Sequence, residues 1–298
     1  MASGFLNVWK PAGMTSHGAV AQVRRIAGMR QVGHAGTLDP DAVGVLPMAL
    51  GAYTRLLPYA DLTPKVYRAE VAVGALTHTG DAAGRIVGRS RSWPMDLKTL
   101  ERTGHWLTGS IWQVPPQVSA LKQGGRRHYE AVRNREVVWP EPRRIVVHAL
   151  RNICLSDRGW SFEAEVGSGT YVRSLVRDWG YLMGVAAHLS ALTRIQVGRW
   201  TEASAVSLED LAALGEQWTV RLESWASHLR TDGVVVLSDE EAERVRHGDM
   251  RVLGGSGWPS GGVVALTHQG ALAAIVEGSP WRYRLVVEEG SHADMERR

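Results

Sequence analysis

Apolar and polar residues alternate along several segments of the chain, and a period of two predicts β-strands. Residues 66–73 are the clearest case, because Tyr67, Ala69, Val71 and Val73 fall on one side of an extended chain. The same pattern predicts strands at residues 3–9, 145–155 and 161–166, and we expect the last two to pair with each other.

Apolar residues recur at helical spacing in three other segments, which predicts helices at residues 16–29, 96–107 and 171–183. Ser16 is expected to cap the first of these helices. A short polar helix is predicted at residues 128–136. Residues 33–51 contain four glycines and two prolines, so we expect a tightly folded segment rather than a helix. Helices mixed with hairpin-like strands predict an α+β fold with a mixed or antiparallel sheet.

The pattern of residues along the chain changes after residue 200. Residues 201–228 have the pattern of an acidic helical connector, and short strands separated by glycine-rich turns follow it. These strands are predicted at residues 234–237, 263–267, 271–276 and 283–287, with one helix at 239–247. We therefore expect a first domain at 1–228, which includes the connector, and a small β-rich domain at 229–298 that ends in a short disordered tail.

Composition narrows the class of protein. Among the 298 residues Cys154 is the single cysteine, so no intrachain disulfide can form and a reducing, cytoplasmic compartment fits best. No apolar stretch reaches the length of a signal-peptide core or a membrane span, so we expect no membrane association.

Charge is distributed unevenly along the chain. Residues 1–200 carry 25 Lys and Arg against 14 Asp and Glu, whereas residues 201–298 carry 9 against 16. A basic part of this size favours a polyanionic partner, most of all a nucleic acid, over a chance imbalance of charged residues. Only 4 of the 34 basic residues are lysines, which suggests that the remaining lysines occupy positions where a compact ammonium is needed.

The segment Gly33-His34-Ala35-Gly36-Thr37-Leu38-Asp39-Pro40-Asp41 combines titratable side chains with glycines. Taken alone, Asp39 before a proline is typical of a helix start, and His34 is more often structural than catalytic. The whole segment nevertheless places a His, a Thr and two Asp on a loop with little apolar packing. Loops of this kind carry function more often than core.

This segment, continued by Gly44-Val45-Leu46-Pro47, resembles the active-site block of the TruB family of tRNA pseudouridine-55 synthases. Five more blocks resemble that family in the same order, so that the resemblance covers residues 4–200. They are Lys10–Ser16, Lys65–Ala69, Pro115–Lys122 with Tyr129-Glu130 after it, Gly169–Leu175 and Ala187–Arg194. Three of the four lysines lie in these blocks.

The resemblance implies a pseudouridine synthase domain followed by a PUA-like module. It implies isomerisation of uridine 55 in the T-loop of tRNA, through base flipping and without a cofactor or metal. The partner would be the T-arm of tRNA, with no small-molecule cofactor, and the protein would be a cytoplasmic monomer. The absence of a phosphate loop, a dinucleotide fingerprint or a Cys/His cluster from the sequence agrees with this expectation.

The resemblance also assigns roles to residues. Asp39 would be the nucleophile, Arg173 would hold its charge with a planar guanidinium, and Tyr171 would lie at the edge of the base and assist removal of the C5 proton. The other implied contacts to the base or the RNA are Tyr67 as stacking residue, Leu192 as apolar contact, His34 in the gap left by the flipped base, and Lys10, Lys65, Lys122 and Arg126.

The sequence differs from the family's pattern at two places, and two other functions are considered beside the implied one. Val118 stands where the family usually has Tyr, and the acidic second domain suggests a small RNA contact, near Arg282 and Arg284. One alternative is a non-catalytic tRNA-binding or folding chaperone, which would not need the carboxylate of Asp39. The other is a nucleoside hydrolase or glycosylase, which needs an activated water, and the sequence offers no paired-carboxylate or metal site for one.

Overall fold

The computed structural model describes residues 2–90, 96–117, 140–254 and 258–287, and the backbone alone at 122–123 and 126–127. Its main sheet has ten strands, in the order β14-β1-β3-β12-β4-β11-β10-β7, with β13 beside β12 and β2 beside β3. The bounds are β1 Gly4–Lys10, β2 Val32–His34, β3 Val43–Leu50, β4 Lys65–Val73, β7 Gly109–Gln113, β10 Arg143–Ser156, β11 Gly159–Val166, β12 Ala187–Val197, β13 Trp200–Thr201 and β14 Val206–Ser207.

The sheet is mixed, because β12 runs parallel to β3 and β14 runs parallel to β1, while its other pairs are antiparallel. Two small hairpins stand apart from it, β5 (Ala75–Thr77) with β6 (Ile86–Arg89) and β8 (Lys122–Gln123) with β9 (Arg126–Arg127). The alternation at 66–73 is confirmed, since Tyr67, Ala69 and Val71 are buried on one side of β4.

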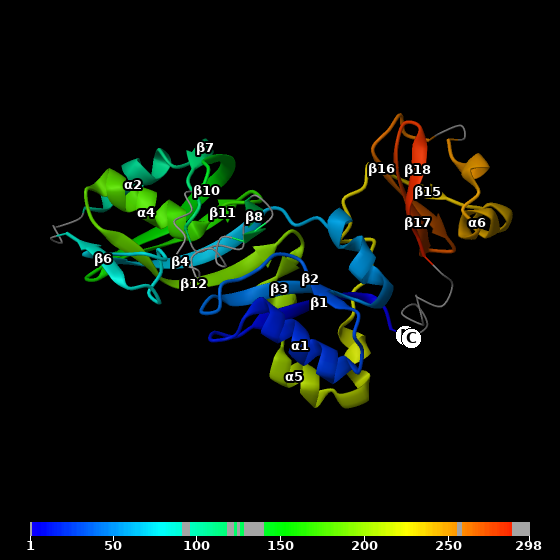
Figure 1. Ribbon diagram of the computed structural model, residues 1–298, viewed down its shortest axis with the longest axis horizontal. Helices are drawn as coiled ribbons and strands as arrows, with labels where there is room; N and C mark the ends of the chain where they lie inside the picture. Colours follow the sequence, from blue (N-terminus) through cyan, green and yellow to red (C-terminus); the bar gives the residue numbers. More distant parts are fainter. Residues whose placement is uncertain are drawn as a thin grey trace.

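Two groups of helices cover the two halves of the sheet (Figure 1). Helices α2 (Leu97–His105) and α4 (Val172–Met183) pack on β4, β10, β11 and β12, where Trp179 meets Trp160 and Phe162 edge to face. Helices α1 (Ser16–Ala27) and α5 (Leu208–Ala213) pack on β1 and β3, together with the 3-10 helix η3 (Gly215–Arg221). Three other 3-10 turns are η1 (Gly51–Tyr59), η2 (Glu202–Ser204) and η4 (Met250–Val252).

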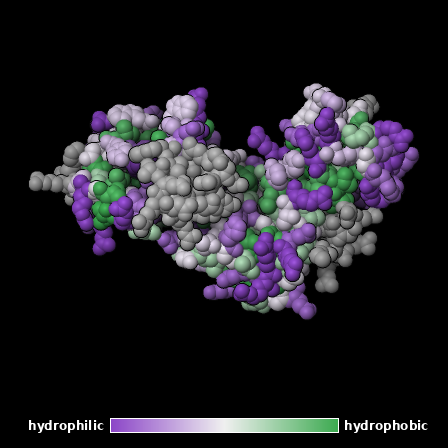
Figure 2. Space-filling view, viewed as in Figure 1, coloured by the Kyte–Doolittle hydropathy of each residue, from purple (hydrophilic) through white to green (hydrophobic). Residues whose placement is uncertain are grey.

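A second sheet follows, with the order β15-β16-β17-β18 and the bounds Gly233–Val236, Val263–His268, Ala271–Gly278 and Trp281–Val286. Helix α6 (Asp239–Arg246) covers one face of it, and Figure 2 shows hydrophilic side chains gathered over this helix. The other face shares a buried cluster with the main body, in which Ile275 and Leu285 join Phe5, Trp200 and Trp225. The predicted α+β fold with a small β-rich C-terminal part is therefore confirmed.

The structure corrects several local predictions. Thr15, not Ser16, caps α1, since its Oγ1 accepts a hydrogen bond of 2.9 Å from the amide of Gly18. The connector at 201–228 is not simply helical, because it contains strand β14, which pairs with β1, and two 3-10 helices besides the short helix α5. The apolar spacing that predicts a helix at 96–107 includes Leu97, but this side chain is 42% exposed. The predicted helix at 128–136, Val118 and the tail at 289–298 lie outside the described residues.

None of the helices in the described part of the chain has the length and apolar character that a membrane span requires.

Candidate active site

The loop between β2 and β3 carries Asp39. The two strands pair antiparallel, with Val32 opposite Leu50 and His34 opposite Met48, so residues 35–42 form the tip of a hairpin. The hairpin lies tightly against β12, because Gly44 has φ +119° and a β-carbon there would lie 2.2 Å from the carbonyl oxygen of Arg194. Only glycine allows this approach, which brings the Asp39 loop next to β12.

Two side chains hold the backbone on either side of Asp39. The Oγ of Ser16 donates to the carbonyl of Leu38 at 3.1 Å and accepts from its amide at 2.9 Å. The Nζ of Lys10 donates to the carbonyl of Pro40 at 2.9 Å and to two other carbonyls at 2.7 Å each. Both side chains are buried, so water does not compete for these hydrogen bonds.

Arg173, in the first turn of α4, forms a bidentate ion pair with Asp39. Its Nε lies 2.9 Å from Oδ2, and one terminal nitrogen donates to Oδ1 at 3.1 Å. The other terminal nitrogen donates to the carbonyl of Thr79 at 2.8 Å and lies 3.6 Å from a carboxylate oxygen of Asp81. Arg173 is 5% exposed, whereas the side chain of Asp39 is 41% exposed. The guanidinium is thus fixed, and the carboxylate faces open space.

Burial raises the pKa of the Asp39 carboxyl above its ordinary value, and the nearby carboxylate of Asp81 raises it further. The guanidinium of Arg173 acts against both by stabilising the ionised form. The site therefore presents a partly desolvated carboxylate whose charge is held by one planar cation, which is the condition that a carboxylate nucleophile needs.

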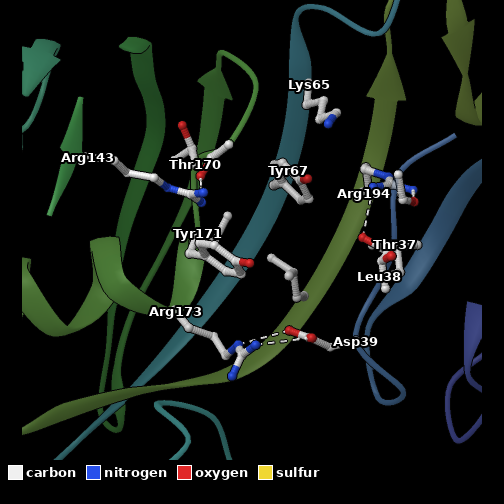
Figure 3. A pocket seen from close by; sticks show the side chains of 14 residues that line it. Thr37, Leu38, Asp39, Lys65, Tyr67, Arg143, Thr170, Tyr171, Arg173 and Arg194 are labelled. Atoms are coloured by element: carbon white, nitrogen blue, oxygen red, sulfur yellow. Dashed lines mark hydrogen bonds and ion pairs between the residues drawn. The ribbon is translucent and has the colours of Figure 1, made fainter. Parts of the chain in front are cut away.

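Asp39 and Arg173 line a cavity of about 300 Å³ (Figure 3), at the lower end of the volumes typical of ligand sites. Its walls carry the flat ring of Tyr67 from β4 and the aliphatic side chain of Leu192 from β12, and Tyr171 lies between Arg143 and Arg173 in the view. A planar base fits such a combination of an aromatic face, an apolar wall and a carboxylate.

The position of Tyr171 is set by two neighbours. The side chain of Gln113 accepts from the amide of Tyr171 at 2.9 Å and donates to its carbonyl at 3.1 Å. The guanidinium of Arg143 lies 4.9 Å from the centre of the Tyr171 ring, as a cation–π contact, and also donates to the carbonyl of Gly169. These contacts hold the phenol over the cavity.

A larger cavity of about 940 Å³ adjoins the first one and shares Asp39, Arg173 and Leu192 with it. His34 and His17 line it and meet edge to face, with ring centres 5.7 Å apart. Burial lowers the pKa of His34, and His17 lowers it further, so the His34 ring is neutral near pH 7. A neutral imidazole suits a role in filling apolar space between bases.

The structure brings together most of the predicted site residues. Six of them line the smaller cavity and one, His34, lines the adjoining cavity; the six are Asp39, Lys65, Tyr67, Tyr171, Arg173 and Leu192. Their chemical roles remain predictions. The side chains of Lys122 and Arg126 are not among those described. The backbone places Lys122 opposite Arg127 and Arg126 opposite Gln123 in the β8–β9 pair.

Lys10 does not lie where the sequence reading placed it. It was expected to bind RNA, but it is 0% exposed and all three hydrogen bonds of its ammonium go to backbone carbonyls. Burial lowers its pKa to about 8, against the attraction of Asp41 and Asp39. In this conformation Lys10 supports the loop, and none of the three donors of its ammonium remains for a phosphate.

Four residues of the site had no role in the sequence reading. Arg194 lines the cavity, Asp81 contacts Arg173, and Gln113 and Arg143 hold Tyr171. Arg194 ends one of the six sequence blocks, which is a signal that was present without an assigned role. The other three carry no motif of their own, and only the folded chain places them at the site.

Comparison with known proteins agrees with this geometry. The family model described as TruB family pseudouridylate synthase (N terminal domain) matches residues 24–172, and that of the tRNA pseudouridylate synthase B C-terminal domain matches residues 173–231. A protein of Thermobifida fusca named tRNA pseudouridine synthase B is 45% identical over 83% of this chain and 86% of its own length. Its namesake from Streptococcus gordonii is 39% identical over 83% of this chain and 87% of its own length.

Solved structures have the same fold. The chain of a Cbf5-Nop10-Gar1 complex superposes with a TM-score of 0.68 and 25% identity, covering 92% of this chain and 78% of that one. A chain from an H/ACA RNP bound to a substrate RNA superposes with a TM-score of 0.65 and 23% identity, covering 92% of this chain and 77% of that one. On the family models and these identities, the chain belongs to the TruB family of pseudouridylate synthases.

Proposed function

We propose that this protein isomerises uridine 55 in the T-loop of tRNA to pseudouridine. The bidentate pair of Asp39 and Arg173 inside a cavity of base size is the observation that carries the proposal. In the reaction the N1–C1′ glycosidic bond breaks, the uracil turns, C5 forms a bond to C1′ and loses its proton, and N1 takes up a proton. Reactant and product are isomers, so the balance needs no oxidant, reductant or water.

In this proposal Asp39 is the nucleophile, and its charge is kept available by Arg173. The target base leaves its stack and enters the smaller cavity, where Tyr67 stacks on it and Leu192 covers its other side. The hydroxyl of Tyr171 lies at the edge of the base and assists departure of the C5 proton. His34, in the adjoining cavity, fills the space that the base vacates.

The partner in this proposal is the T-arm of tRNA, bound by a monomer in the cytoplasm. The excess of basic residues in positions 1–200 supports an RNA partner. The relatives named tRNA pseudouridine synthase B support tRNA as the class of RNA.

The test is to incubate the purified protein with an unmodified tRNA transcript and to map pseudouridine along it. We expect pseudouridine at position 55 with the wild-type chain and none with Asp39→Asn, which keeps the shape of the carboxylate without its nucleophilic charge. Binding of the transcript by Asp39→Asn should stay within a few-fold of wild type. Wild-type turnover by that variant would remove Asp39 from its role, and tRNA binding without any pseudouridine would favour the folding chaperone.

A further inference from the structure

The end of the smaller cavity that faces away from Asp39 carries two cations, Lys65 at the start of β4 and Arg194 on β12 (Figure 3). Both lie close to Gly36, since a β-carbon on that glycine would be 3.6 Å from the Nζ of Lys65 and 3.6 Å from a terminal nitrogen of Arg194. Gly36 has φ +94° and no side chain, which leaves the space beside both nitrogens open.

Arg194 is 1% exposed, so its charge is removed from water. Its Nε donates to the carbonyl of Val45 at 2.8 Å, and its terminal nitrogens donate to the carbonyls of Gly36 at 3.0 Å and Thr37 at 3.5 Å. A guanidinium has five N–H donors, so two remain for another acceptor. These contacts hold the planar group at the wall of the cavity without neutralising it.

Neither cation has a carboxylate partner among the described residues, and no hydrogen bond of the Lys65 ammonium is found there either. Asp39 does not supply one, because Arg173 binds both of its oxygens. Burial lowers the pKa of Lys65 to about 8, and the charge of Arg194 contributes to that shift. Two adjacent cations in a buried position repel each other and are costly until an anion joins them.

We propose that Lys65 and Arg194 form a subsite for one phosphodiester of the RNA, next to the nucleotide whose base enters the cavity. This inference rests on the proposed function. A neutral uracil oxygen needs one donor, whereas a phosphate matches a guanidinium fork and a point-like ammonium together. The subsite and the Asp39–Arg173 pair hold the nucleotide from two ends, which fixes the sugar relative to the carboxylate.

The experiment measures equilibrium binding of a T-arm stem-loop RNA to the full chain over a range of salt concentrations. Lys65→Met keeps the aliphatic stem and removes the charge, so affinity should fall about ten-fold and the salt slope should decrease by about one. Lys98→Met is the matched control, because Lys98 is exposed on α2 and does not line the cavity. It should leave both quantities unchanged.

The RNA is varied in parallel, with a single neutral methylphosphonate placed 5′ or 3′ of the target uridine, or in the stem as a control. At the contacted linkage the wild-type chain should lose about as much affinity as Lys65→Met does, and the variant should lose no more. The wild-type protein alone identifies the contacted linkage, and Lys65→Gln repeats the comparison if Lys65→Met folds poorly. The subsite would be overturned if, at both flanking linkages, the affinity losses from the methylphosphonate and from Lys65→Met were independent and therefore multiplied. It would also be overturned if Lys65→Met bound the RNA as Lys98→Met does.

Pseudouridine formation on the unmodified stem-loop is recorded with the same wild-type preparation. Its absence overturns the proposed function. Its presence, together with independent effects of Lys65 and the flanking phosphates, overturns the phosphate subsite alone.

Discussion

The hydroxyl of Ser16 and the backbone of Leu38 form a reciprocal pair of hydrogen bonds, with Oγ donating to the carbonyl at 3.1 Å and accepting from the amide at 2.9 Å. Ser16 is 2% exposed, and Leu38 directly precedes Asp39. The first residue of α1, a helix that packs on β1 and β3, thereby fixes the backbone next to the candidate nucleophile.

Ser16→Ala should lower kcat about ten-fold or more while KM stays within a few-fold. The substitution leaves a buried amide and carbonyl unsatisfied, at about 1–3 kcal/mol, and a relaxed loop misplaces the carboxylate. Single-turnover rates and thermal melts measure the two effects. Ser207→Ala is the control, because it removes the N-cap of α5, at about 1 kcal/mol, away from the cavity. Equal kcat losses in both variants would reduce the Ser16 effect to general destabilisation.

Lys10→Met should reduce stability and leave RNA contact unchanged. The ammonium donates to three backbone carbonyls in partly buried hydrogen bonds, and we expect the loss of all three to cost about 1–3 kcal/mol in total, because water can reach part of the freed groups. Denaturant unfolding measures that loss, and the salt dependence of RNA binding should match that of wild type. A smaller salt slope in Lys10→Met would return Lys10 to the RNA-binding set.

Arg173→Lys should lose most activity although it keeps the charge. A single ammonium cannot maintain the bidentate contact to Asp39 and the hydrogen bond to Thr79 from one position. We expect kcat/KM to fall at least about a hundred-fold, because the carboxylate then loses both its orientation and part of its charge stabilisation. Rates near those of wild type would show that charge alone matters at position 173.

Activity should fall on the acid side with an apparent pKa above the usual value of about 3.9 for Asp, because burial raises the pKa of Asp39. In the proposed role of Asp39 the ionised form is the reactive one, so rate is expected to fall as pH decreases through this pKa. The negative charge of Asp81 contributes to the shift, so Asp81→Asn should move the acid limb to lower pH.

Single-turnover rates measured from about pH 4 to pH 8 give this limb. Asp157→Asn, in the turn between β10 and β11, is the control and should leave the limb in place. A limb in Asp81→Asn that moves to higher pH, or does not move, contradicts the proposed coupling of Asp81 to Asp39.

Removing residues 224–298 should destabilise the main body, although the net negative charge of that part suggests a small role in RNA binding. Trp225 would be lost, and Phe5, Tyr53 and Trp200 would lose the apolar face of the C-terminal sheet. We expect a lower melting temperature and binding of an apolar dye by the shortened chain. A shortened chain as stable as the full one would show that the shared cluster contributes little.

Local patterns in the sequence predicted what short-range physics controls. Alternation located β4, β10 and β11, and helical spacing located α1, α2 and α4. The glycine-rich segment at 33–51 was correctly expected not to be a helix, but the strand β3 that it contains was not predicted. The caps show the limit of this reasoning, since Thr15 and Ser16 are both good N-cap residues and the sequence favoured the wrong one. The hydroxyl of Ser16 bonds instead to the backbone of Leu38, 22 residues away in the sequence.

The six sequence blocks indicated the candidate site residues, and the tertiary structure decided what surrounds each of them. Lys10 and Lys65 read alike in the sequence, yet one is enclosed by carbonyls under the loop and the other faces a cavity beside Arg194. Burial and charge pairing depend on contacts such as Arg173 with Thr79 and Arg194 with Gly36, which join residues 94 and 158 positions apart. Periodicity within one segment carries no information on such contacts, because they arise only when the strands assemble into one sheet.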